Sequence, residues 1–144
     1  MINRFSVVTG GRITERPIAF SLVYRRRRVD VELPDVVAIE AHEDITFVLP
    51  DGELKSFRAP RVAVTLAPRG QLQIQRLTTA HVGEVMKILV CNEVVSSPRI
   101  CEPLGQHPTF NITANDFADA EAFAVKMRRG WVRPELRVVG GVAT

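Results

Sequence analysis

The sequence lacks any long apolar run, and this bounds what the protein can be. Its hydrophobic stretches are short, whereas a membrane-spanning helix needs about 20 apolar residues. The chain also does not open on a basic start followed by an apolar core and a small-residue cleavage site. As it stands, the sequence therefore predicts no transmembrane segment, no export signal and a cytoplasmic protein. If an upstream signal has been removed, the cell envelope or periplasm is the alternative.

Cysteine, histidine and large aromatic residues are scarce, with two Cys, three His, one Trp and one Tyr. Cys91 and Cys101 are expected to lie about seven residues apart along a hairpin strand, or over ~20 Å at 3.3 Å per residue. A disulfide needs Cα atoms within about 7 Å. We therefore expect two small buried side chains rather than a bridge. The net charge of +3 and pI of about 9.3 do not require a polyanionic partner.

The usual signatures of catalysis and of phosphate binding are missing. There is no GxxxxGK loop, no GxGxxG and no GxSxG around Ser96-Ser97. Glu40, His42 and Asp44 could share one strand face, but one His with two carboxylates is a weak metal set. We expect a solvated strand face, no bound metal and no cofactor.

A Cys–His nucleophile would need Cys91 or Cys101 beside His81 or His107. Cys91 lies in an apolar run, where a thiol is inert. Cys101 is the better candidate because it lies near the loop that contains His107, but no catalytic signature surrounds it. A small enzyme stays an alternative, since general acid–base carboxylates follow no spacing rule.

Alternating apolar residues predict two strands with a bend between them. The first set has even numbers and the second has odd numbers: Ile18, Phe20, Leu22 and Tyr24, then Val29, Val31 and Leu33. The first set has the period of a half-buried strand. Asp51-Gly52 between apolar runs predicts a hairpin, and Gly10-Gly11 predicts a turn. Residues 1–59 are thus expected to form an antiparallel, sheet-rich part.

The predicted bend carries Arg25, Arg26, Arg27 and Arg28 in succession. Guanidinium groups bind phosphate in a bidentate manner, so this run is a candidate site for nucleic acid, an anionic membrane or an acidic protein. Nucleic-acid modules usually add a wider basic face or stacking aromatic residues, and only Tyr24 adjoins the run. A solvated turn is the simpler interpretation.

After residue 60 the pattern mixes strands and helices. Leu72, Ile74 and Leu77 are interpreted as a strand, followed by a short helical turn that Thr78 or Thr79 caps and Gly83 ends. The run from Met86 to Cys91 predicts a strand covered on both faces. Asn92-Glu93 is expected to turn the chain, and Pro98 places the return strand at a sheet edge.

The last helix is the clearest element, expected from Asp116 to Arg129. Its apolar residues recur every three or four positions and share one face: Phe117, Ala120, Phe123, Ala124 and Met127. Asn115 or Asp116 can cap its start, and Gly130 is the expected left-handed terminator. Residues 132–144 are expected to be a loose tail.

Residues 60–131 carry a string that resembles the head subdomain in the first periplasmic domain of SecD and SecDF, the protein-export subunits. The matching positions are Leu77-Thr78, Val82-Gly83, Ile88-Leu89-Val90, Val94-Val95-Ser96-Ser97-Pro98-Arg99-Ile100, Pro103-Leu104, Ile112, Phe117 and Arg128-Arg129-Gly130. Three departures stand out. Glu84 replaces a frequent Lys, Asn92-Glu93 replaces Asp-Gly, and the glycine-rich loop shortens to Gly105-Gln106-His107-Pro108.

The resemblance implies an α+β fold whose C-terminal amphipathic helix covers a sheet. It also implies a non-catalytic interaction module that binds a polypeptide or a partner subunit. The family-motif positions Thr78, Gly83, Val95, Ser96, Pro98, Ile100, Phe117 and Gly130 are expected to be mostly structural. The two alternatives are a basic surface binder acting through the arginine run and a small enzyme. The sequence does not indicate an oligomeric state.

Overall fold

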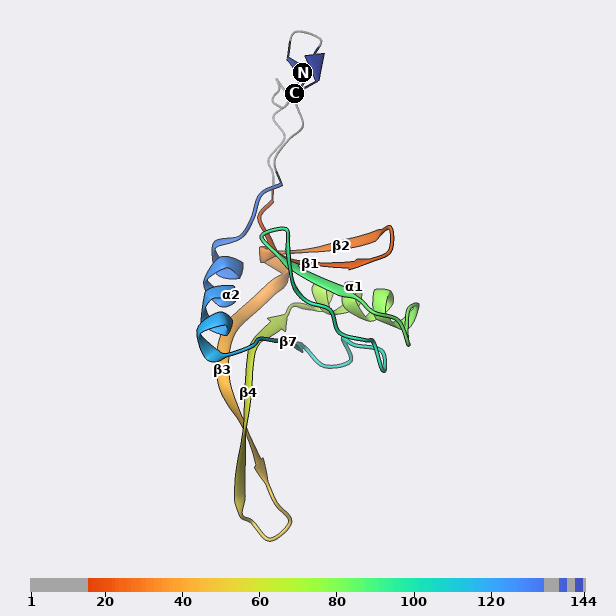
Figure 1. Cartoon of the computed structure of the whole chain (residues 1–144). Helices are drawn as coiled ribbons and strands as arrows, with labels where there is room; N and C mark the ends of the chain where they lie inside the picture. Colours follow the sequence, from red (N-terminus) through yellow and green to blue (C-terminus); the bar gives the residue numbers. More distant parts are fainter. Residues whose placement is uncertain (1–15, 134–137, 140–141, 144) are drawn as a thin grey trace. The chain divides into compact units, whose positions relative to one another are not determined.

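The computed structural model describes residues 16–133, 138–139 and 142–143, which fall into two units. One unit is Ile18–Trp131, and the other is formed by the two ends of the chain. In the second unit, β8 (Val138–Val139) and β9 (Val142–Ala143) pair antiparallel, so regular structure occurs within the expected tail. The turn expected at Gly10-Gly11 lies outside the described residues. Everything below concerns Ile18–Trp131 (Figure 1).

The first sheet has four strands in the order β2-β1-β5-β6. They are β1 (Ile18–Tyr24), β2 (Arg27–Glu32), β5 (Lys87–Val90) and β6 (Glu93–Ser96), and each pairs antiparallel with its neighbour. The predicted bend is the β1–β2 turn. Antiparallel pairing such as Leu22↔Val29 joins even to odd positions, which explains the change of parity. The expectation of a half-buried β1 is wrong, because Ala19 and Ser21 are buried as well in this inner strand.

The second sheet has three strands in the order β3-β4-β7. They are β3 (Val36–Val48), β4 (Leu54–Leu66) and β7 (Thr109–Thr113). The hairpin predicted at Asp51-Gly52 joins β3 to β4, as expected. Both strands are much longer than the short runs that predicted them, and β7 pairs only with residues 61–65 of β4. The far ends of β3 and β4 therefore project from the rest of the unit (Figure 1).

Helix α1 (Pro68–Thr79) corrects the sequence interpretation, which placed a strand at Leu72 and Ile74. Pro68 starts it, since a proline at the first helical turn loses no hydrogen bond. Its buried residues are Gly70, Ile74, Leu77 and Thr78, a helical spacing on one face. Thr78 lies in the last turn of this helix and does not cap a following one.

Helix α2 (Phe117–Arg129) confirms the predicted last helix. The Asp116 side chain caps it by accepting a 2.8 Å hydrogen bond from the Asp119 backbone N–H. Ala120, Ala124 and Met127 are fully buried. Gly130 ends the helix with φ +80°, although its ψ of 158° lies outside the left-handed helical region that was expected.

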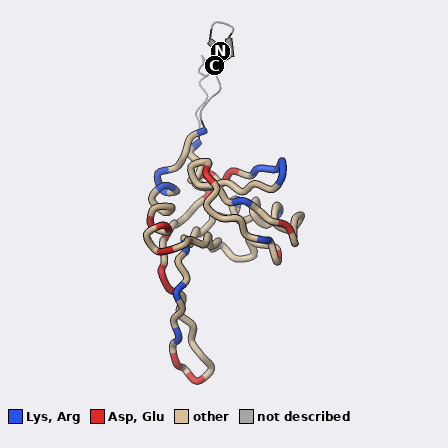
Figure 2. Tube along the Cα trace, viewed as in Figure 1, with Lys and Arg blue, Asp and Glu red and all other residues tan. Residues whose placement is uncertain are grey.

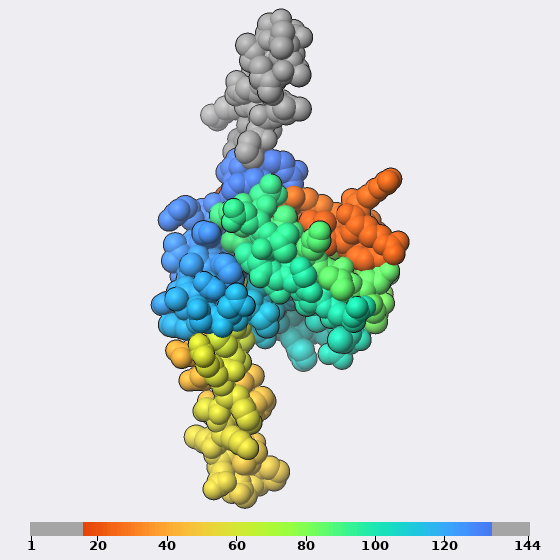
Figure 3. All heavy atoms as spheres, viewed as in Figure 1, coloured from red at the N-terminus to blue at the C-terminus, as the bar shows by residue number. Residues whose placement is uncertain are grey.

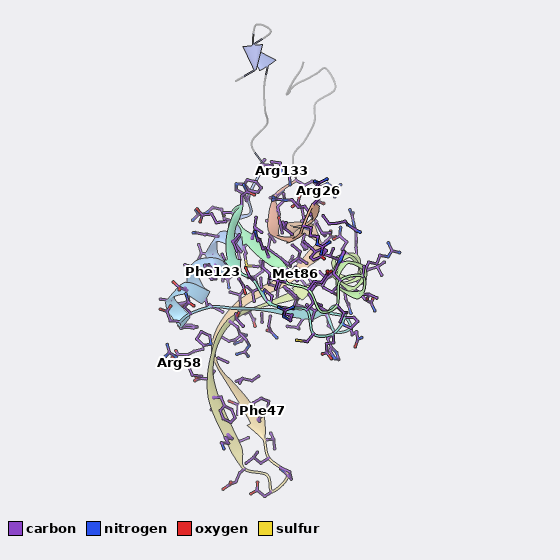
Figure 4. The ribbon with its side chains drawn as sticks, turned by 45° about the vertical axis from the view of Figure 1, so that its right-hand side comes forward. Arg26, Phe47, Arg58, Met86, Phe123 and Arg133 are labelled. Carbon is purple, nitrogen blue, oxygen red and sulfur yellow. The ribbon has the colours of Figure 1, made fainter. Side chains whose placement is uncertain are left out.

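Both sheets and both helices surround one apolar core, to which β1, β4, β5 and α2 contribute. Met86, a member of this core, is labelled in Figure 4. The fold is α+β, as predicted, and the described residues contain no helix that could span a membrane. The expected boundary between residues 59 and 60 falls inside β4, and β1 from before it pairs with β5 from after it. As a boundary between modules it stays a prediction.

The β5–β6 turn differs in detail from the expected one. Its turn residues are Cys91 and Asn92, both with positive φ (51° and 64°), and Val90 pairs with Glu93. Because the turn starts one residue earlier than expected, Cys91 does not face Val94. Both cysteines are free, as expected, but the expectation that both are buried is wrong, because Cys91 is partly exposed and Cys101 is exposed. Pro98 follows β6, which is an edge strand as predicted.

Candidate functional site

The projecting hairpin carries the most exposed apolar cluster on one element. We call residues 43–58 the arm. Four of its apolar side chains are 46–72% exposed: Phe47, Val48, Leu54 and Phe57. In the space-filling view the arm, gold to yellow, stands clear of the remaining residues of the unit (Figure 3), and the Phe47 label marks its outer part (Figure 4). Large apolar side chains at such a place are normally a binding surface.

The arm has two distinct faces because antiparallel partners point to the same side. One face is aromatic: the Phe47 and Phe57 rings meet edge to face at 5.8 Å, and Lys55 Nζ lies 5.3 Å from the Phe57 ring centroid. The other face pairs Val48 with Leu54, beside a 2.9 Å hydrogen bond between the Thr46 and Ser56 hydroxyls. Both faces therefore offer apolar contact near the tip.

The charges of the arm are mainly negative, in contrast to the whole chain. Residues 43–58 contain four acidic side chains, Glu43, Asp44, Asp51 and Glu53, and two basic ones, Lys55 and Arg58. Figure 2 shows acidic residues at the turn of the arm and again at its base, with the basic residues between them along β4. A net charge of −2 on an apolar surface favours segments that mix apolar and basic side chains.

The structure divides the candidate arginine run. Arg28 is tied down by hydrogen bonds to Asp30 (2.8 Å), Asn92 (3.0 Å) and Ser21 (3.2 Å). Arg25 lies 3.5 Å from the Glu84 carboxylate and over the Tyr24 ring. Both therefore hold the β1–β2 hairpin to its neighbours. Arg26 and Arg27 are exposed, and anion or partner binding through the run stays a prediction.

A cleft of about 430 Å³ lies beneath the loop between β6 and β7. Its lining includes Met86, Ile100 and Phe110 from the core, with Cys101 and His107 from the loop. The structure thus places the favoured Cys–His candidates at one cleft. The Cys101 thiol makes its hydrogen bond to the Arg99 carbonyl oxygen, at 3.7 Å. Among the described residues no hydrogen bond joins this thiol to His107, so the geometry gives the Cys–His pair no support as a nucleophile and base.

Thr78 anchors the loop that lines this cleft. The Thr78 hydroxyl accepts a 2.8 Å hydrogen bond from the Leu104 backbone N–H and donates to the Ile74 carbonyl oxygen, also at 2.8 Å. The side chain is fully buried. A motif position thereby joins the last turn of α1 to the loop, which is a structural role.

Replacing Thr78 with Val should destabilise the protein by about 1–3 kcal/mol, because the change leaves the Leu104 N–H buried without an acceptor. Urea unfolding of both proteins measures the difference. The variant Thr78→Ser keeps the hydroxyl and serves as the control. Equal stability of wild type and Thr78→Val would show that the hydrogen bond to the loop contributes nothing.

Tyr24, His81 and Glu84 form a polar cluster at the end of β1. The Tyr24 and His81 rings lie 4.0 Å apart, and His81 Nδ1 is 3.3 Å from Glu84 Oε2. The hydrogen bond between Tyr24 and Glu84 raises the pKa of Tyr24 and lowers the pKa of Glu84. The Glu84 carboxylate thus accepts a hydrogen bond from the Tyr24 hydroxyl, which a Lys at this position could not do because an ammonium group has no acceptor.

Glu84→Gln should lower stability at neutral pH and have a smaller effect in acid. The folded-state pKa of Glu84 is lowered from its ordinary 4.5, so the carboxylate stabilises the fold above that pH and loses its effect as pH falls through the folded value. Urea midpoints at about pH 7 and about pH 3 test this. A difference between wild type and variant that grows toward acid would contradict it.

The possible metal ligands on β3 do not form a set. His42 Nε2 lies 3.4 Å from Glu40 Oε1, and a bulge separates His42 from Asp44 in the pairing with β4. Within residues 16–133, no group of three or more ligating side chains comes together.

The remaining motif positions lie along the path from α1 to α2. The Gly83 N–H donates to the Ile100 carbonyl oxygen at 2.6 Å, and the Met86 N–H donates to the Pro98 carbonyl oxygen at 2.9 Å. Ile100 is buried, whereas Val95 and Phe117 are partly exposed. The Ser96 hydroxyl lies 3.4 Å from that of Thr113. The structural role expected for these motif positions stays a prediction.

The sequence analysis missed the arm as a site, although a signal was present. Ile45, Phe47 and Val48 place apolar residues on both faces of one strand end, beside a turn. A strand that is apolar on both faces needs cover on both, and a hairpin tip has none. This conflict identifies the exposed cluster without coordinates.

Within Ile18–Trp131, two antiparallel sheets, two helices and a projecting hairpin define a small α+β subdomain. The family model for the P1 head subdomain of SecDF matches residues 49–132 of this chain. This match covers more than half of the sequence, so the chain belongs to the SecDF P1 head family, as the motifs predicted. The family is that of a periplasmic subdomain, which favours the envelope alternative and does not support the cytoplasmic expectation.

Two solved structures are also similar. One is described as a membrane component, SecDF, that enhances protein export; it is 19% identical with a TM-score of 0.44, over 69% of this chain and 44% of that one. The other is SecDF in a super-membrane-facing form, 18% identical with a TM-score of 0.45, over 63% of this chain and 12% of that one. This chain spans less than half the length of either. No curated protein sequence matches it.

Proposed function

We propose that this protein is a non-catalytic binding subdomain that holds unfolded polypeptide segments in the cell envelope, as part of a protein-export component. The observation that carries the proposal is the arm, with Phe47, Val48, Leu54 and Phe57 exposed at the end of a hairpin. Family membership supports an export context. The contact surface itself is inferred from the structure of this chain.

An unfolded partner fits the arm better than a folded one. Folded proteins bury most of their large apolar side chains, whereas an unfolded chain displays them along its length. The arm is a two-stranded ribbon with apolar residues on both faces, and such a ribbon is only marginally stable alone in water. An apolar segment laid across it removes apolar area from water on both partners, which favours association.

Titration of a labelled model protein tests the proposal. The full chain is added to a fluorescent small protein whose disulfides have been reduced and blocked, which keeps it unfolded, and to the same protein in its native form. Fluorescence anisotropy should rise with the unfolded form alone. Equal binding of both forms, or binding of neither, would overturn the proposal.

A further inference from the structure

The outer edge of β3 adjoins a groove that has the shape of a strand-binding site. In the described part of the chain β3 is the end strand of its sheet, with β4 on one side only. A groove of about 380 Å³ runs along it, lined mostly by Leu33, Val36, Val37, Ala38 and Ile39, and closed by Arg128 from α2. An edge strand beside a helix can accept an extended segment that continues the sheet.

Arg128 shows which backbone groups face the groove. Its guanidinium donates two hydrogen bonds to the Ile39 carbonyl oxygen, from Nε at 3.1 Å and from Nη2 at 2.6 Å. In an antiparallel strand the N–H and C=O of one residue point to the same side, and alternate residues point the same way. The Ile39 and Ala41 backbone groups therefore face outward, away from β4.

Bulges limit the length of edge that a partner can use. The pairing of β3 with β4 is irregular between Val36 and Ala38 and again between His42 and Asp44. Bulges twist an edge away from further pairing. The regular stretch is 38–42, which lies next to the groove and holds both outward-facing residues.

The charge along this edge indicates the chemistry of the partner. Strand β3 contains Glu40, Glu43 and Asp44 and has neither Lys nor Arg. The Glu40 side chain is 67% exposed. A segment with basic side chains on one face and apolar side chains on the other would pair with Glu40 and fill the groove.

We propose that residues 38–42 of β3 bind an extended, basic and apolar polypeptide segment by strand addition, with the added backbone pairing to Ile39 and Ala41. A backbone N–H of the segment donates to the Ile39 carbonyl oxygen in place of the Arg128 guanidinium, and the long Arg128 side chain changes conformation to make room. This inference rests on the proposed function and deepens it, because it names the backbone that an unfolded chain would pair with and the charge that it would carry.

Peptide binding to the full chain tests the inference. The probe is a labelled peptide of about nine alternating Lys and Val residues, which spans residues 38–42 with overhang at ~3.3 Å per residue. A Glu/Val peptide of equal length tests the charge. Anisotropy should show binding of the Lys/Val peptide and at least about tenfold weaker binding of the Glu/Val peptide.

Ala41→Pro removes one outward N–H and leaves the bonds to β4 in place, since proline is tolerated where the N–H of an edge strand faces outward. It should weaken Lys/Val binding by roughly tenfold, whereas the control Ala41→Ser should not. In wild type, hydrogen exchange at the Ile39 and Ala41 amides should slow when the peptide is bound, which tests the inference even if the proline variant does not fold.

The outcomes separate this inference from the proposed function. Unchanged exchange at both amides, or equal affinity of Ala41→Pro and Ala41→Ser, overturns strand addition. If the unfolded protein still binds the chain in that case, the proposed function stands without it. If neither the unfolded protein nor the peptide binds, both fail.

Discussion

Replacing Phe47, Val48, Leu54 and Phe57 together with threonine should reduce binding of unfolded polypeptide by about 100-fold or more. Full burial of one such side chain is worth about 1.5–3 kcal/mol. Half of the lower value from each of the four side chains already totals about 3 kcal/mol, whereas a 100-fold change requires about 2.8 kcal/mol. Threonine keeps the preference for strand structure. Anisotropy titration with the blocked, unfolded protein measures the loss.

Stability should fall by no more than about 2 kcal/mol in the same variant, because each of the four surface substitutions usually changes it by at most about 0.5 kcal/mol. A matched control replaces Val85 and Val94 with threonine; these are also exposed, at 44% and 53%, but lie away from the arm. The control should bind like wild type. If the control loses as much affinity as the arm variant, general surface hydrophobicity and not the arm is responsible.

Gly105→Ala should destabilise the fold by about 3 kcal/mol, combining backbone strain with steric overlap. Gly105 has φ +85°, and a Cβ there would lie 2.7 Å from the Gln71 carbonyl oxygen and 2.9 Å from the Gln75 nitrogen. Both neighbours belong to the backbone of α1, which cannot yield as a side chain does. The loop above the cleft would therefore lift from the helix.

Gly52→Ala separates the two causes. Gly52 has nearly the same φ, +89°, but nothing lies within 4 Å of the Cβ position. Urea unfolding of Gly52→Ala should show only the cost of strain, about 1–2 kcal/mol, so Gly105→Ala should be clearly the less stable. Equal losses in the two variants would mean that the loop does not pack on α1 as the structure shows.

Locally determined elements could be predicted from the sequence. The Asp51-Gly52 hairpin depends on two turn residues, and α2 depends on an apolar stripe, a capping Asp116 and a final Gly130. The bend between β1 and β2 also followed from the change of parity, although their pairing as a hairpin did not. In each case neighbours in the sequence settle the structure, so no knowledge of the tertiary fold is needed.

Features that depend on distant residues could not be predicted. The strand expected at Leu72 and Ile74 is wrong because each period fits only two of the three apolar residues there: Leu72 and Ile74 have strand spacing, whereas Ile74 and Leu77 have helical spacing. The packing of Gly70 against Asp35 depends on the tertiary fold. The hydrogen bond from Arg28 to Asn92 could not be predicted, because the two residues are 64 positions apart in the sequence. The length of the arm depends on where β7 stops pairing with β4, which the sequence of the hairpin does not encode.

Site-specific photo-crosslinking at the arm tests the binding role most directly. A photoreactive residue in place of Val48, which is 72% exposed, should capture the blocked, unfolded protein on irradiation, and an excess of unlabelled unfolded chain should reduce that capture. The same residue in place of Val94 should capture little. Capture at Val94 equal to that at Val48, or none at Val48, would contradict polypeptide binding by the arm.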